Sequence, residues 1–151
     1  MASLAFVVLL PAGAGEAPGF TAETLRHESL SIDDYRGKVV LLQFWASWCK
    51  SCIASIASLQ SLYEKHGDRG FEIIGISLDE AIEDARRAVA EQGMSWPQVC
   101  DGRGKDSPVA RRYDVKGTPH YVLIDRDGAV AAPYVRAGEI EQRLTPLLTE
   151  D

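Results

Sequence analysis

The sequence predicts an α/β fold in which a central mixed β-sheet carries helices on both faces. Residues 38–45 (KVVLLQFW) and 71–78 (FEIIGISL) are nearly continuous apolar runs, as expected of strands buried on both faces. Between them, apolar side chains recur at helical spacing at Cys52, Ile56, Leu59 and Tyr63. A strand, a helix and a strand in about forty residues form a unit with parallel strands and a right-handed crossover.

The neighbouring segments are shorter. Residues 30–35 precede the first strand and end in a turn at Arg36-Gly37. After the second strand, residues 80–92 (EAIEDARRAVAEQ) have the pattern of a charged amphipathic helix ended by a glycine. Residues 96–100 then predict a short extended piece, followed by a polar loop.

The C-terminal part predicts a short helix, a hairpin and a last helix. The short helix covers residues 108–113, with a proline in its first turn. Residues 121–125 and 129–135 are expected to pair around a turn at residues 126–128. Ile140, Leu144, Leu147 and Leu148 suggest the last helix, which Pro146 is expected to kink or interrupt.

The bulk composition is that of one soluble domain. The chain has 151 residues, of which 46% are hydrophobic and 25% charged. Its net charge is −6 and no basic stripe stands out, which argues against nucleic acid and against a membrane partner held by charge. We expect a monomer.

The first fourteen residues differ from the rest. Residues 4–10 form an uncharged apolar run that is too short to span a bilayer. Ala12-Gly13-Ala14 has the small-x-small form of a signal-peptidase site, although the positive start of a secretory signal is missing. Residues 1–14 are therefore expected to be a signal or anchor remnant or a flexible tail, and residues 15–151 the folded domain.

Two of the three cysteines, Cys49 and Cys52, are three residues apart, and Cys100 is alone. A zinc ribbon would need a second Cys or His pair, and haem attachment would need His where Ile53 stands. As a structural disulfide the pair would close too small a loop to add much stability. A redox-active pair remains, with no metal. Cys100 is expected to be a small buried hydrophobic residue, the alternative being a regulatory or partner-linked thiol.

The position of the pair assigns a role to each cysteine. A buried strand that ends in WASWC and opens a helix places Cys49 at the helix N-terminus, where free N–H groups and the helix dipole stabilise a thiolate. Cys52 follows one turn later, on the same face but deeper. Cys49 is thus expected to attack a substrate disulfide and Cys52 to resolve the mixed disulfide, or the cycle runs in reverse.

WASWCKSC after a buried strand, with Gly117-Thr118-Pro119 far downstream, resembles the thioredoxin-like superfamily, and the fuller string is similar to its TlpA/ResA branch. The similarity covers about residues 15–148. It implies a thioredoxin fold and a thiol–disulfide oxidoreductase without a bound cofactor, usually extracytoplasmic and often a reductant. The matching stretches are APGF (17–20), RGKVVLLQFWASWC (36–49), LYEKHGDRGFEIIGISLDE (62–80), WPQVCDG (96–102) and YDVKGTPHYVLIDRDG (113–128).

The resemblance also implies roles by position. Cys49 corresponds to the attacking thiol, Cys52 to the resolving thiol, and Pro119 to a cis-proline that packs beside the disulfide. The backbone of Thr118 would pair with an extended substrate peptide, and Trp48 would form a wall of the substrate groove. His120 follows Pro119 and either modulates substrate binding or is an ordinary strand residue.

Other positions are particular to this chain. Gln43 stands where cytoplasmic thioredoxins carry a buried Asp, and it cannot titrate. Glu80 fits a Glu of the ResA-like pattern and could act as general base for Cys52, or it only caps a helix. Lys50 and Ser51 replace a pair that commonly contains Pro. A looser first turn and a cation beside the thiolate would both favour the reduced state and raise the reduction potential.

The expected partners are protein thiols and disulfides, including an upstream dithiol donor or acceptor, with a membrane tether through the N-terminus left open. Two other functions compete. A thiol peroxidase of the peroxiredoxin kind carries Thr three residues before its attacking Cys, where this chain has Ala46. A metal-binding redox chaperone would use the pair with His120, and Cu(I) suits two thiolates, but no further sulfur ligand is evident.

Overall fold

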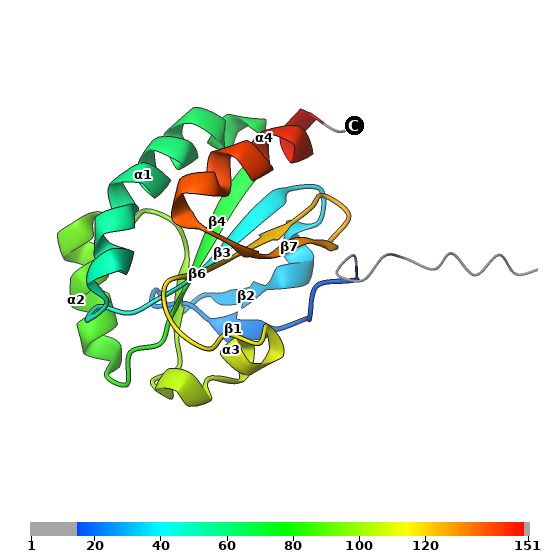
Figure 1. Cartoon of the computed structure of the whole chain (residues 1–151). Helices are drawn as coiled ribbons and strands as arrows, with labels where there is room; N and C mark the ends of the chain where they lie inside the picture. The colour runs from blue at the N-terminus through cyan, green and yellow to red at the C-terminus, as the bar shows by residue number, and fades with distance from the viewer. Residues whose placement is uncertain (1–14, 150–151) are drawn as a thin grey trace, which may run out of the picture.

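The computed structural model describes residues 15–149, so the signal, anchor remnant or tail expected over residues 1–14 lies outside the described residues. Within the described part, a mixed sheet has the strand order β5-β4-β3-β6-β7 (Figure 1). Strands β3 (Val39–Trp45), β4 (Phe71–Ser77) and β5 (Gln98–Cys100) pair in parallel; β6 (His120–Ile124) pairs antiparallel with β3, and β7 (Val130–Val135) pairs antiparallel with β6.

Helices cover both faces of this sheet, which confirms the predicted architecture (Figure 1). Helices α1 (Lys50–His66) and α4 (Ile140–Thr149) pack on one face. The short α3 (Pro108–Arg112) packs on the other, and α2 (Ile82–Gln92) flanks the β5 end. The core therefore has two layers, one on each side of the sheet.

Strand β3 belongs to both layers. Its even-numbered side chains, Val40, Leu42 and Phe44, join the cluster on the α3 face. Val39, Leu41 and Trp45 alternate with them and join the cluster beneath α1 and α4. All seven residues of the strand are buried, so the continuous apolar run of the sequence follows directly from its central position.

Helix α1 starts and stops where the sequence predicts. Cys49 is its N-cap and Gly67 follows its last residue. Helix α2 begins at Ile82, with Ala81 as its N-cap, so Glu80 lies in the loop before the helix rather than inside it. Helix α4 continues through Pro146, an exposed residue near the end of the helix, and is not interrupted there.

The N-terminal hairpin was not predicted. Strands β1 (Thr21–Glu23) and β2 (Ser29–Ser31) pair antiparallel, and a 3-10 helix over residues 32–35 follows. Each strand has only three residues, and most of their side chains are polar or partly exposed, so no apolar alternation marks them. In the sequence only residues 30–35 stood out as a short segment.

Within residues 15–149, no helix is both long and apolar enough to cross a bilayer.

Candidate active site

The predicted site residues gather at one edge of the sheet. In the strand register Trp45 lies opposite Ser77, and Ser77 opposite Cys100. Since parallel strands end at the same edge, the loops that follow these three residues lie next to one another. Strand β6 runs antiparallel and starts at this edge with His120, directly after Thr118-Pro119.

Cys49 and Cys52 form a disulfide at this edge, with their Cα atoms 5.2 Å apart. Cys49 caps α1, and its sulfur accepts a hydrogen bond from the backbone N–H of Cys52 (3.3 Å). That N–H belongs to the first turn of the helix and has no partner within the helix. Cys49 is 7% exposed and Cys52 is fully buried, so of the two residues only Cys49 is in contact with solvent.

The residues around the pair face outward. Lys50 and Ser51 are exposed, and the hydroxyl of Ser51 lies 3.5 Å from the Cys49 sulfur. Trp48, next to Cys49 in the chain, is 69% exposed, whereas Trp45 is buried. A large indole held in solvent beside a disulfide is available for contact with another molecule.

The Thr118–Pro119 peptide bond is cis, in agreement with the resemblance. His120 lies opposite Phe44 and contacts its ring on the α3 face of the sheet. Its Nε2 donates to the carbonyl of Pro133 (3.0 Å). Tyr121, the next residue of β6, belongs to the cluster beneath α1 that also holds both cysteines, so by strand alternation His120 points to the opposite face of the sheet.

Glu80 is exposed, in the loop between β4 and α2. Its side chain lies over Gly104, where an added Cβ would come within 3.0 Å of the Glu80 Cγ. Among residues 15–149, no hydrogen bond joins Glu80 to either cysteine.

The neighbouring acid, Asp79, was not singled out in the sequence. It is 1% exposed and accepts hydrogen bonds from the backbone and hydroxyl of Ser47 and from the hydroxyl of Ser77. The signal was present, because Asp79 directly follows the buried run of residues 71–78, which pairs with the strand that leads to Cys49.

A neutral polar network lies under the α1 face near the pair. The indole N–H of Trp45 donates to Gln98 Oε1 and that of Trp96 to Gln43 Oε1, both at 2.9 Å. Both glutamines are buried. Where a cytoplasmic thioredoxin has a carboxyl group, this chain therefore holds an amide that anchors an indole.

Cys100 is a buried free thiol, as predicted, and its sulfur donates to the backbone carbonyl of Asp79 (3.6 Å). Burial raises the pKa of this thiol above its ordinary value. It therefore resists ionisation at neutral pH.

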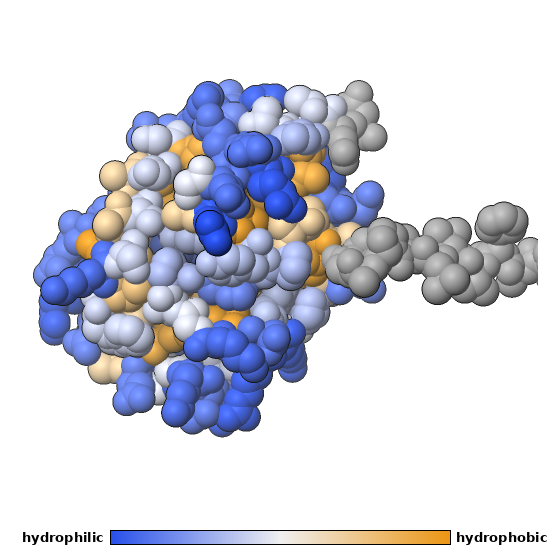
Figure 2. All heavy atoms as spheres, in the orientation of Figure 1, coloured by the Kyte–Doolittle hydropathy of each residue, from blue (hydrophilic) through white to orange (hydrophobic). Residues whose placement is uncertain are grey.

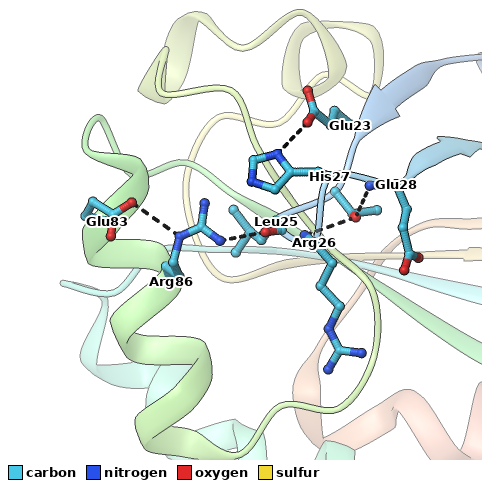
Figure 3. Close-up of polar contacts among 8 residues, drawn as sticks. Glu23, Leu25, Arg26, His27, Glu28, Glu83 and Arg86 are labelled. Atoms are coloured by element: carbon cyan, nitrogen blue, oxygen red, sulfur yellow. Dashed lines mark hydrogen bonds and ion pairs between the residues drawn. The ribbon is translucent and has the colours of Figure 1, made fainter.

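A separate cavity of about 530 Å³ lies beside α2, at the β5 end of the sheet. Leu25, Arg26 and Glu28 line it from the loop after β1, and Arg86 lines it from α2. Figure 3 shows Arg86 donating to the Leu25 carbonyl and to Glu83, which ties this loop to the helix. Neither Cys49 nor Cys52 lines the cavity.

No group of three or more His, Cys, Asp or Glu side chains suited to hold a metal occurs within residues 15–149.

The chain matches the AhpC/TSA family over residues 14–132. It is 32% identical over 127 residues to the thiol-disulfide oxidoreductase ResA of Bacillus thuringiensis (strain Al Hakam), covering 84% of this chain and 72% of the relative. The ResA of Bacillus cereus (strain ATCC 10987 / NRS 248) is 33% identical over 115 residues, which are 76% of this chain and 65% of that protein.

Solved structures agree with these relatives. The thioredoxin domain of a thiol-disulfide oxidoreductase from Bacteroides vulgatus has a TM-score of 0.77 at 32% identity, over 87% of this chain and 96% of that one. A thiol:disulfide interchange protein from Bacteroides sp. has a TM-score of 0.79 at 31% identity, over 92% and 91%. The predicted thioredoxin fold is confirmed.

Proposed function

The chain belongs to the AhpC/TSA family and is a thiol–disulfide oxidoreductase similar to ResA, and from that premise we propose that Cys49 and Cys52 are its exchanging pair. One observation carries the proposal. Cys49 caps α1, its sulfur accepts a hydrogen bond from the Cys52 N–H, and the residue is in contact with solvent, whereas Cys52 is fully buried one turn later. A thiolate at Cys49 is stabilised there, and only Cys49 can meet a substrate.

The cycle follows from this asymmetry. The Cys49 thiolate attacks one sulfur of a substrate disulfide, forms a mixed disulfide and releases the other substrate sulfur as a thiolate. The Cys52 thiolate then attacks the Cys49 sulfur, closes the Cys49–Cys52 disulfide and releases the second substrate thiol. Two electrons pass to the substrate, and an upstream dithiol protein restores the pair. No bound cofactor takes part.

The surrounding residues have proposed roles in binding. Trp48 supplies an exposed wall, Pro119 packs on the cysteine face, and the Thr118 backbone pairs with an extended peptide. His120 acts indirectly, through the strand that begins after Pro119, since its ring lies on the other face. Lys50 and Ser51 tune the pair from the solvent side.

We propose that the protein works outside the cytoplasm and passes electrons to its partners. The likeness to ResA and the apolar run before residue 15 support this placement. The direction can be measured, because reduction potentials of such pairs run from about −270 mV for reductants to about −120 mV for strong oxidants. Equilibration with a dithiothreitol or glutathione buffer should give a value near the reducing end. A value near the other end would make the protein an oxidant.

Variants of the three cysteines test the pair itself. Cys49→Ser should abolish reduction of a disulfide substrate, and Cys52→Ser should accumulate a mixed disulfide with it at Cys49. Cys100→Ala is the matched control and should keep the activity. Glu80→Gln in the same assay should slow only the step made by Cys52. Full activity of Cys49→Ser would refute the assignment, and an unchanged Glu80→Gln would remove Glu80 from the site.

The two competing functions find less support. Ala46 is buried where a peroxidase of the peroxiredoxin kind has a Thr hydroxyl. A chaperone that shared a metal between the pair and His120 would need the imidazole on the α1 face, yet it bonds to Pro133 on the other.

A further inference from the structure

Asp79 is the one acidic side chain that is buried within residues 15–149. Its Oδ2 accepts from the Ser47 N–H (3.0 Å) and the Ser77 hydroxyl (2.6 Å), and its Oδ1 accepts from the Ser47 hydroxyl (2.5 Å). In the same part of the chain, no Lys, Arg or His forms an ion pair with it. Hydrogen bonds to neutral groups are therefore what hold the buried carboxylate.

These bonds fall on the loop that carries Cys49. Trp45 ends β3 and its carbonyl accepts from Leu78, while the N–H of Cys49 donates to Ala46. Ser47 lies between these two points, and the Asp79 carboxyl accepts hydrogen bonds from both the N–H and the hydroxyl of Ser47. The segment from the end of β3 to the start of α1 is thus held by Leu78 at its first residue and by Asp79 at its middle, and the bond from Cys49 to Ala46 closes it as a turn.

We infer that Asp79 is a positioning residue for the disulfide exchange: by holding Ser47, it sets where Trp48 and Cys49 lie at the start of α1. This inference rests on the proposed function and deepens it. Asp79 does not touch a reacting sulfur. It acts through the loop, and it keeps the Cys49 sulfur where the Cys52 N–H can donate to it.

A role through charge alone would have the opposite effect. A negative carboxylate near the loop repels a thiolate, so removing the charge would make Cys49 more reactive. Loss of the anchor instead withdraws Cys49 from the helix N-terminus and makes it less reactive. Lys50, the adjacent cation, is unchanged in both cases.

The test is the rate at which iodoacetamide alkylates Cys49 in the reduced protein at neutral pH, with the modified residue located by mass spectrometry. Asp79→Asn should slow it on the order of tenfold, equivalent to about one pKa unit in the thiol. Ser47→Ala keeps the backbone bond to Asp79 and should slow it less. Asp68→Asn makes the same chemical change at an exposed site and should leave the rate unchanged.

Thermal unfolding of each reduced variant shows whether it is folded under the assay conditions. If Asp79→Asn does not fold, Ser47→Ala carries the test, because it removes only one hydroxyl. Equal or faster alkylation in the folded variants would overturn the positioning role. Failure of the proposed function would be recognised by a different result: Cys49→Ser would retain reductase activity, whatever Asp79→Asn does.

Discussion

Lys50 is the first residue of α1 and follows the cysteine that caps this helix. Its exposed ammonium attracts a thiolate at Cys49, but solvent and salt weaken the attraction. We expect Lys50→Gly to raise the pKa of the Cys49 thiol by roughly 0.5 unit, within the range of single surface charges near a helix end. The ultraviolet absorbance of the thiolate, followed against pH in the reduced protein, measures this pKa.

Lys50→Arg is the matched control, because it keeps the charge and should keep the thiol pKa. Added salt should shrink the difference between wild type and Lys50→Gly. Identical titrations of all three proteins would mean that Lys50 only faces solvent.

What the sequence reveals at this scale depends on spacing along the chain. Cys49 and Cys52 are readable because three residues separate them at the junction of a strand and a helix. The role of Asp79 is not readable in this way, since it depends on Ser47, which is thirty-two positions away and follows a different strand. The side to which His120 points follows from its register with Phe44, which no local pattern encodes.

Gly75 shows how one strand makes room for its neighbour. It lies inside the buried strand β4, between Gln43 of β3 and Gln98 of β5 in the register. A Cβ on Gly75 would overlap the Gln98 side chain, which accepts the hydrogen bond from the Trp45 indole. Glycine normally weakens a strand, so its presence here reflects the close approach of this amide.

We therefore expect Gly75→Ala to destabilise the protein by about 3 kcal/mol, the combined effect of overpacking and of a disturbed buried hydrogen bond. Denaturant unfolding followed by tryptophan fluorescence measures the change. Gly138→Ala adds the same methyl group where nothing lies within 4 Å, and it should change stability by less than about 1 kcal/mol. Equal stability of the two variants would show that Gln98 moves aside without loss.

Elements were predictable in proportion to the apolar surface they bury. Strands β3 and β4 and helix α1 repeat apolar residues over seven residues or more, and their positions are confirmed. The hairpin of β1 and β2 buries little along three-residue strands, so its pairing depends on tertiary contacts. One such contact is the bridge between Thr24 and Val99.

The whole molecule consists of two apolar layers around one sheet, under a surface that is mostly hydrophilic on the face shown in Figure 2. Tyrosines belong to both layers. Tyr121 is buried under α1, and Tyr113 is buried on the α3 face, where its hydroxyl donates to the Pro18 carbonyl. Burial raises the pKa of both phenols above the ordinary value of about 10. Tyr134 is exposed.

The two buried phenols lead us to expect a loss of folding stability at alkaline pH. Below about pH 10 the folded and unfolded chains both keep the phenolic protons, so the phenols do not change stability with pH. Above it the unfolded chain loses protons that the folded chain retains, and stability falls as the pH rises through the raised folded-state pKa values. Wild-type protein should therefore lose stability steeply between about pH 10 and pH 12.

Tyr121→Phe isolates one phenol. The Tyr121 hydroxyl has no hydrogen-bond partner within residues 15–149, although Ser55 is near enough to offset part of the effect of burial on its pKa. Removing the Tyr121 hydroxyl should leave the free energy of unfolding at pH 8 nearly unchanged. At pH 11 it should add about 1 kcal/mol to the free energy of unfolding, since one pH unit is worth about 1.4 kcal/mol for one proton. Tyr134→Phe changes an exposed phenol and should follow the wild type at both values. Denaturant unfolding of wild type and the two variants at pH 8 and pH 11 tests this prediction. Equal losses of stability in all three proteins would mean that groups other than Tyr121 drive the alkaline transition.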